Sequence, residues 1–196
     1  MKNDISAIGN ALVDTVFKVE HSLIQELGLE IDQMTLSSAE EHSPIIERLI
    51  ESGADTVSDC GGSATNSLVA AASFGAKCFH TCKVSDDQDG VRYLESLKEA
   101  GVGHKGNMAS ANKIPTGKCL ILVTPDAKRT MTTALNVSSL MDENDLDLDQ
   151  IANSKIFYIE GYMVTSEENY KATLQALNHL QDFPDVKIAF SLSDPG

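Results

Sequence analysis

The residues best suited to bind a small polar ligand lie near the N-terminus, in the run Gly9-Asn10-Ala11-Leu12-Val13-Asp14. In an extended strand, residues two apart share a face, so Asn10, Leu12 and Asp14 point the same way. An amide and a carboxylate around an apolar contact suit a sugar or nucleoside, whose hydroxyl groups need partners while its flatter face rests on aliphatic carbon. The segment alone fits an exposed strand face with incidental polarity equally well.

A second candidate is the turn at Gly61 and Gly62, which leads into an Ala-rich segment that ends at Gly75. Two glycines allow backbone conformations that a β-carbon forbids, and they let a ligand approach the main chain. The segment predicts a helix whose first turn carries unpaired N–H groups, with Asn66 directed to the same place. The turn fits a phosphate cradle, the floor of a sugar site or a plain connection. Beside Asn10 and Asp14, the sugar site is the better interpretation.

Short apolar and β-branched runs between predicted helices indicate the elements that position these residues. The expected strands are 5–8, 13–19, 77–81, 119–124, 156–160 and 188–192. Capping-box sequences at Ser38 and Thr165 predict two helix starts, and a third helix is expected from Asp86 or Asp87 to Gly101. In these helices the apolar residues are expected to face the core: Val91, Leu94 and Leu97 in the third, and Tyr170, Leu174, Leu177 and Leu180 in the one after Thr165. The alternation predicts an α/β fold with a mainly parallel sheet.

One stretch breaks the alternation. Residues 117–124 and 129–133 are extended around a Pro-Asp turn, which predicts a β-hairpin. A hairpin inside an α/β chain is often a lid over a site.

Composition limits the classes of partner. The 196 residues are 42% hydrophobic, and 29 acidic against 15 basic residues give a net charge of −14. This charge argues against nucleic acid or an anionic membrane as a partner. No apolar run has the length of a membrane span and the N-terminus is polar, so a cytoplasmic protein is expected. The four cysteines fit no zinc pattern, and the acidic run 142–149 lacks the glycine and glutamate of a calcium loop, so no metal site is expected.

Several motifs occur together in a fixed order. They are the Gly9–Asp14 opening, the Gly61–Asn66 helix start, the Lys83–Gly90 turn, the Pro115–Asp126 hairpin and the segments Met34–Leu36, Arg129–Met131, Tyr158–Tyr162 and Ser191–Pro195. Together they resemble the ribokinase/PfkB family of carbohydrate and nucleoside kinases, most closely its adenosine-kinase-like bacterial sugar kinases. The resemblance covers essentially the whole chain. It implies a ribokinase-like fold with a small β lid formed by residues roughly 12–36 and 106–135.

The resemblance also implies an activity, the ATP-dependent phosphorylation of a primary hydroxyl of a sugar or nucleoside with Mg²⁺. By position, Asp14 would take substrate hydroxyl groups, Asn10 and Asn66 would hydrogen-bond the sugar, and Gly61 with Gly62 would let the ring approach the backbone.

Two further residues have implied roles that the sequence leaves open. Glu160, at the end of a central strand, would add a polar contact or help to place Mg²⁺ through water. Arg129, on the hairpin, would reach substrate or developing phosphate charge, and it fits a solvated surface cation equally well. Which sugar or nucleoside is bound stays open.

The catalytic base of this family is the Asp of a later Gly-Ala-Gly-Asp segment, which residues 1–196 do not contain. We therefore expect the N-terminal part of one ribokinase-like domain, without its C-terminal nucleotide-binding half and inactive alone. The alternative is a non-catalytic module that binds a sugar or nucleoside. A dinucleotide-dependent oxidoreductase is disfavoured because no G-x-G-x-x-G follows the first strand. Exposed lid strands could also pair two subunits into a homodimer.

Overall fold

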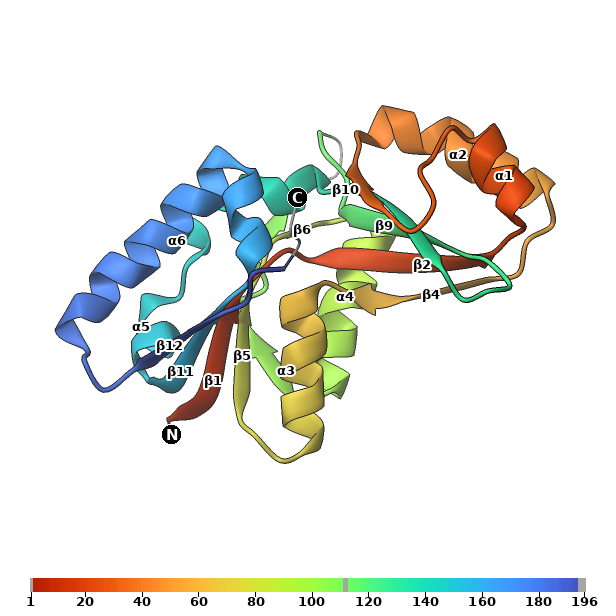
Figure 1. Ribbon diagram of the computed structural model, residues 1–196. Coiled ribbons are helices and arrows are strands. Elements are labelled where there is room, and N and C mark those ends of the chain that lie inside the picture. Colours follow the sequence, from red (N-terminus) through yellow and green to blue (C-terminus); the bar gives the residue numbers. More distant parts are fainter. Residues whose placement is uncertain (1, 111–112, 194–196) are drawn as a thin grey trace.

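The computed structural model describes residues 2–110 and 113–193 and contains two five-stranded sheets (Figure 1). All neighbouring strands of the first sheet are parallel. In spatial order they are β12 (Lys187–Phe190), β11 (Ser154–Ile159), β1 (Asn3–Ile8), β5 (Cys78–Thr81) and β7 (Val102–His104). The prediction of an α/β fold with a mainly parallel sheet is confirmed.

Helices cover both faces of this sheet. One face packs against α3 (Ser63–Ser73) and α4 (Gln88–Glu99), and the other against α5 (Leu148–Ala152) and α6 (Glu167–His179). Strand β1 shows why both faces are apolar: Ala7 belongs to the core under α3, whereas the next residue, Ile8, belongs to the core under α6. Alternating side chains of a central parallel strand are buried on opposite sides.

The second sheet projects from one end of the first (Figure 1). Its strands are β3 (Met34–Leu36), β10 (Arg129–Ala134), β9 (Gly117–Val123), β2 (Leu12–Lys18) and β4 (Thr56–Gly61), in that order. Helices α1 (His21–Glu26) and α2 (Ala39–Glu51) cover one face, where Phe17, Leu120 and Leu122 form a core with Ile24 and Leu49. The other face looks toward the first sheet's helices and forms a cavity, described below.

Short elements complete the chain. They are the strands β6 (Val84–Ser85) and β8 (Met108–Ala109) and the 3₁₀ turns η1 (Asn136–Leu140), η2 (Glu143–Asp145), η3 (Gly161–Thr165) and η4 (Leu180–Asp182). The predicted strands are present, and β9 and β10 form the predicted antiparallel hairpin. The polar strand β4 and the short β3 and β7 have no long apolar run and were not predicted. Asp194 and Pro195 of the last motif, and residues 111–112 of the expected lid, lie outside the described residues.

The helix starts correct two details of the sequence interpretation. Ser38 forms a capping box with Glu41, as predicted. At α6 the cap is Ser166, whose Oγ accepts from the N–H of Asn169 (3.2 Å), and Thr165 belongs to η3 instead. The expected box at Thr165 is wrong because η3 continues through that residue.

The predicted core faces of two helices are confirmed only in part. On α6, Tyr170 is 47% exposed and Leu174 is 40% exposed, whereas Asn169 is fully buried. On α4, Val91 is 44% exposed and Tyr93 takes the buried position. Leu97 on α4 and Leu180, just after α6, are buried as expected. On α6 a hydrogen-bonded polar residue, Asn169, also takes a buried position.

Within residues 2–110 and 113–193, none of the helices combines the length and apolar character needed to span a bilayer.

Candidate functional site

The two sheets meet at Gly9–Ala11, which connects β1 to β2. Here the carboxyl ends of β1 and β11 lie beside the start of α3, opposite the inner face of the second sheet. A cavity of about 220 Å³ opens between them. Ligands of open α/β sheets bind at this edge, outside the carboxyl ends of parallel strands.

Seven of the eight predicted site residues line this one cavity. They are Asn10, Leu12, Asp14, Gly62, Asn66, Arg129 and Glu160. The eighth, Gly61, lies directly behind the wall: a β-carbon at this position would be 2.1 Å from Cγ of Asp14. Gly61 therefore makes room for the Asp14 carboxylate. Residues separated by up to 150 positions in the sequence, such as Asn10 and Glu160, are brought into contact.

Asp14 is placed by β2, where it is paired with Cys119 of β9 on one side and Asp59 of β4 on the other. Burial raises the pKa of Asp14 to about 6. Arg129 opposes this increase through its positive charge, and Asp59 adds to it. The carboxylate is thus largely ionised at neutral pH and can accept hydrogen bonds from hydroxyl groups.

Gly62 is the N-cap of α3, with φ of 97°. A β-carbon here would lie 2.4 Å from the backbone oxygen of Asn10. A side chain is therefore excluded both by the left-handed backbone and by the close packing of the turn on the link between the sheets. Asn66 lies on the next turn of α3 and lines the cavity.

Glu160 follows β11 and is 1% exposed. Its Oε2 accepts from the N–H of Ala64 (2.9 Å), and its Oε1 accepts from the backbone N–H and from Nδ2 of Asn10 (both 3.3 Å). Burial raises the pKa of Glu160, and these hydrogen bonds oppose the increase. The N–H of Ala64, one of the first-turn groups that the sequence left unpaired, therefore already has an internal carboxylate as its partner.

The apolar wall of the cavity comes from the second sheet, on the same face as Asp14, and from Leu135 just beyond β10. It consists of Met34, Leu36, Cys119, Ile121, Met131, Thr133 and Leu135. Met34, Leu36 and Met131 belong to motifs noted in the sequence, but none of the seven was predicted as a site residue. Their signal is the two-residue alternation on three strands, whose registers place Met131 beside both Met34 and Ile121. Ser63, Tyr162 and Thr165 also line the cavity.

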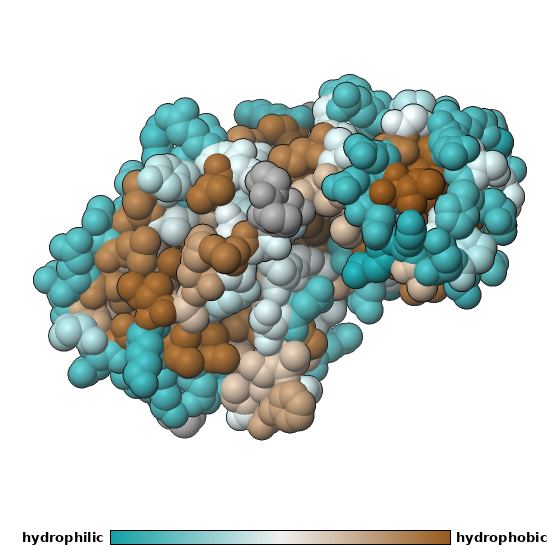
Figure 2. Space-filling model, in the orientation of Figure 1, coloured by the Kyte–Doolittle hydropathy of each residue, from teal (hydrophilic) through white to brown (hydrophobic). Residues whose placement is uncertain are grey.

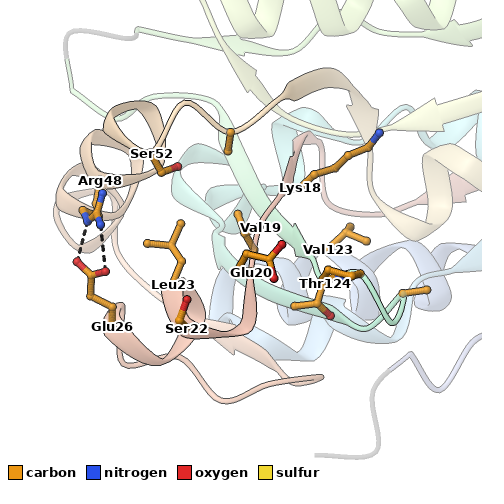
Figure 3. Close-up of a pocket in the computed structure, with 13 residues that line it drawn as sticks. Lys18, Val19, Glu20, Ser22, Leu23, Glu26, Arg48, Ser52, Val123 and Thr124 are labelled. Carbon is orange, nitrogen blue, oxygen red and sulfur yellow. Dashed lines mark hydrogen bonds and ion pairs between the residues drawn. The ribbon is translucent and has the colours of Figure 1, made fainter.

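A larger cavity, of about 580 Å³, lies at the far end of the second sheet (Figure 3). It is bordered by α1, the end of α2 and the β9–β10 turn, and none of the predicted site residues lines it. Its most prominent charged pair is already satisfied, since Arg48 donates two hydrogen bonds to Glu26 (2.7 and 3.0 Å). The junction cavity is therefore the better candidate site.

No three His, Cys, Asp or Glu side chains gather as a metal-binding group in the part of the chain that the structure describes. Asp14 and Glu160, the two carboxylates of the cavity, are each engaged with protein partners or buried beside Arg129. They offer no ready set of ligands for Mg²⁺.

Comparison with known proteins identifies the family. The model of the pfkB family of carbohydrate kinases matches residues 30–195. The chain belongs to the pfkB family. Among curated proteins, no sequence matches this pfkB chain significantly.

Solved structures of similar fold support the assignment. A probable sugar kinase from Rhizobium etli is 26% identical, with a TM-score of 0.91 over 99% of this chain and 57% of that one. The adenosine kinase from Sinorhizobium meliloti is 30% identical, with a TM-score of 0.87 and the same coverage. The adenosine kinase from Anopheles gambiae, at 22% identity and a TM-score of 0.84, shares the fold over all of this chain and 58% of its own. The pfkB chain thus spans a little more than half the length of these kinases.

Proposed function

We propose that this pfkB chain supplies the acceptor-binding half of an ATP-dependent kinase that phosphorylates a primary hydroxyl of a sugar or nucleoside. One observation carries the proposal: Asn10, Asp14 and Asn66 line the same cavity as the apolar wall. A ligand with hydroxyl groups at one part and a flat apolar surface at another would satisfy both kinds of lining.

Within this proposal, each polar residue has a distinct task. The ionised Asp14 accepts hydrogen bonds from ligand hydroxyl groups, and the amides of Asn10 and Asn66 add directional contacts. Arg129 brings positive charge to the cavity, where it orients the ligand or stabilises developing phosphate charge. Glu160 acts on the site through the groups that it holds, Asn10 and the start of α3.

The apolar wall favours a nucleoside over a free sugar. A free sugar is polar on most of its surface, whereas Met34, Leu36, Ile121, Met131 and Leu135 offer a broad apolar contact suited to a base. The similarity to adenosine kinases points the same way, since one of them is 30% identical to this chain. Adenosine is therefore the first ligand to test.

The second sheet acts as the lid in this proposal. The expected lid segments, 12–36 and 106–135, contribute β2, β3, β9 and β10, and the sheet also includes β4. Movement of this sheet about Gly9–Ala11 would close the apolar wall on the ligand and exclude water.

Phosphoryl transfer also needs a base and preorganised positive potential around the transferred group. ATP and Mg²⁺ would supply the phosphoryl group and the neutralising charge. We propose that a further part of the fold holds them, because these residues include no Gly-Ala-Gly-Asp segment and the chain covers 57% of the similar sugar kinase. Apolar side chains exposed over β12 (Figure 2) support a continuing sheet, with Ile188 and Phe190 each 55% exposed.

Two measurements on the 196-residue chain test the proposal. Calorimetry with adenosine, ribose and fructose should detect binding, with adenosine preferred. An assay with ATP, Mg²⁺ and the same ligands should detect no turnover. Absence of binding would overturn the acceptor-site assignment, and robust turnover would overturn the assignment of the base to another part of the fold.

The alternative is a non-catalytic module that binds a sugar or nucleoside. It is favoured because residues 1–196 contain no Gly-Ala-Gly-Asp segment to supply the catalytic base. The coding sequence that follows Gly196 distinguishes the two, because a Gly-Ala-Gly-Asp segment in frame would support the kinase.

A further inference from the structure

A buried row of hydrogen bonds connects the cavity residue Asn10 to helix α6 through Asn169. Nδ2 of Asn169 donates to Oδ1 of Asn10 (3.0 Å), and Oδ1 of Asn169 accepts from the N–H of Met141 (3.1 Å). Asn169 is 0% exposed and Asn10 is 1% exposed. Water therefore does not compete for these hydrogen bonds, and each amide depends on its protein partners.

The orientation of the Asn169 amide is fixed by its surroundings. A backbone N–H can only donate, so the oxygen of Asn169 must face Met141 and its nitrogen must face the opposite way. That nitrogen uses both hydrogens, one on Asn10 and the other on the carbonyl oxygen of Ser138 (3.0 Å).

The orientation of the Asn10 amide follows from this. Its oxygen accepts from Asn169 and also from Oγ of Ser138 (3.1 Å), which itself accepts from the N–H of Ala11 (2.8 Å). Its nitrogen donates to the Glu160 carboxylate (3.3 Å). A flipped amide would set its oxygen against a carboxylate and its nitrogen against the Asn169 donor.

This orientation decides what Asn10 can offer to a ligand. Both lone pairs of its oxygen are used, whereas only one of the two hydrogens on Nδ2 is used by Glu160. Asn10 is thus a hydrogen-bond donor to the cavity. The ionised Asp14, which lines the same cavity, can only accept.

We propose that Asn169 is a positioning residue: without lining the cavity, it holds the Asn10 amide in the orientation that donates to one hydroxyl oxygen of the substrate. The inference rests on the proposed function, because it takes the cavity as the acceptor-substrate site. Ser138 assists as the second donor to the same oxygen.

Asn169→Asp is the sharpest test, because it keeps the shape and the acceptor for Met141 but removes both donated hydrogen bonds. Dissociation constants are measured by calorimetry for adenosine, 2′-deoxyadenosine and 3′-deoxyadenosine. The wild-type chain should prefer adenosine to one of the two analogues by roughly tenfold, the worth of one hydrogen bond. In Asn169→Asp that preference should fall to about twofold or less, while affinity for the deoxy analogue stays nearly unchanged.

Asn178→Asp is the matched control, because it makes the same chemical change at an exposed position of the same helix. Its preference should equal that of the wild type. Ser138→Ala, which removes only one of the two donors, should lower the preference by a smaller factor and gives a second test if Asn169→Asp does not fold.

A merely structural role predicts a different pattern, since a loosened fold weakens all three ligands by the same factor. Uniform weakening, or an unchanged preference in folded Asn169→Asp or Ser138→Ala, would overturn the positioning role. Equal binding of all three ligands by the wild type would overturn this inference and leave the proposed function intact. No binding of any sugar or nucleoside would overturn both.

Discussion

The backbone N–H of Ala64 donates to Oε2 of Glu160 over 2.9 Å, so a residue that follows β11 closes the first turn of α3. The N-cap of this helix, Gly62, has no side chain that could do so. A glycine at the cap leaves space for the link between the two sheets, and a remote carboxylate replaces the missing cap. The geometry of the cavity therefore depends on a contact between distant parts of the chain.

Removal of the Glu160 side chain should destabilise the fold. Glu160→Ala leaves the N–H groups of Ala64 and Asn10 buried without an acceptor, and we expect a loss of about 2–4 kcal/mol in the free energy of unfolding. Urea denaturation measures it. Glu47→Ala, at an exposed site on α2, should change the same quantity by less than about 0.5 kcal/mol. Equal effects of the two substitutions would contradict the capping role.

The two adjacent glycines should respond differently to the same substitution. In Gly61→Ala the new β-carbon would lie 2.1 Å from Cγ of Asp14, so Asp14 must turn away. Because a short side chain can move, we expect a folded protein with adenosine affinity lowered at least about tenfold. Calorimetry and thermal unfolding together separate the two effects. Unchanged affinity would show that Asp14 does not contact the ligand.

Gly62→Ala should instead impair folding, because its β-carbon meets the backbone oxygen of Asn10 and its φ is 97°. The expected loss is more than about 2 kcal/mol of unfolding free energy. Gly53→Ala is the control, since Gly53 has a similar φ of 68° but open space around it. It should lose only about 1 kcal/mol, and a comparable loss at both positions would remove the packing argument.

The sequence predicts those parts of the site that are local. Leu12 and Asp14 share a face because side chains alternate along β2, and Asn10, on the link just before β2, lines the same cavity. The apolar wall depends on which strands pair, as with Met131 between Met34 and Ile121, and no local pattern specifies that register.

Asn169 shows a different limit of sequence interpretation. Apolar spacing on α6 placed Tyr170 in the core, yet the neighbouring asparagine is buried instead. Its burial is tolerated because Met141, Ser138 and Asn10 satisfy all of its amide groups, and these partners come from other segments. A residue with remote hydrogen-bond partners gives no periodic signal.

The Asp14 carboxylate should limit stability at neutral pH. Its pKa is about 6 in the folded chain against 3.8 for an unperturbed carboxyl, so between these values the folded state binds more protons than the unfolded state. The contribution of Asp14 to the unfolding free energy therefore falls as pH rises from about 4 to about 6. Asp14→Asn removes this loss and should be more stable than the wild type at pH 7.5 by about 1–3 kcal/mol.

Urea denaturation across this pH range tests the sign. The advantage of Asp14→Asn should disappear below about pH 4, where the wild-type carboxyl is also neutral. Asp185→Asn, at an exposed position, keeps Asp14 and should follow the pH curve of the wild type. The same Asp14→Asn protein should bind adenosine at least about tenfold more weakly, because it exchanges a charged acceptor for an amide. A variant less stable than the wild type at pH 7.5 would contradict the burial argument.

Arg129 should lower the pH at which Asp14 ionises and can accept hydrogen bonds from a ligand. Its positive charge lowers the pKa of Asp14 from the higher value that burial alone would give. In Arg129→Ala the Asp14 pKa should therefore rise above about 6, whereas Arg129→Lys keeps a charge and should retain most of the effect. Carbon-detected NMR of the Asp14 carboxyl group measures the titration directly.

Ligand affinity should follow the same titration, since the neutral acid is a poorer acceptor for hydroxyl groups. Adenosine binding by Arg129→Ala should weaken more at pH 6.5 than at pH 8. The reason is that a higher Asp14 pKa leaves more of the carboxyl group protonated at pH 6.5. Arg92→Ala removes an exposed cation that donates to the backbone of Ser58 on β4, and it should leave the Asp14 titration unchanged. If the Asp14 pKa were the same in Arg129→Ala and in the wild type, Arg129 would be a solvated surface cation with no role at the cavity.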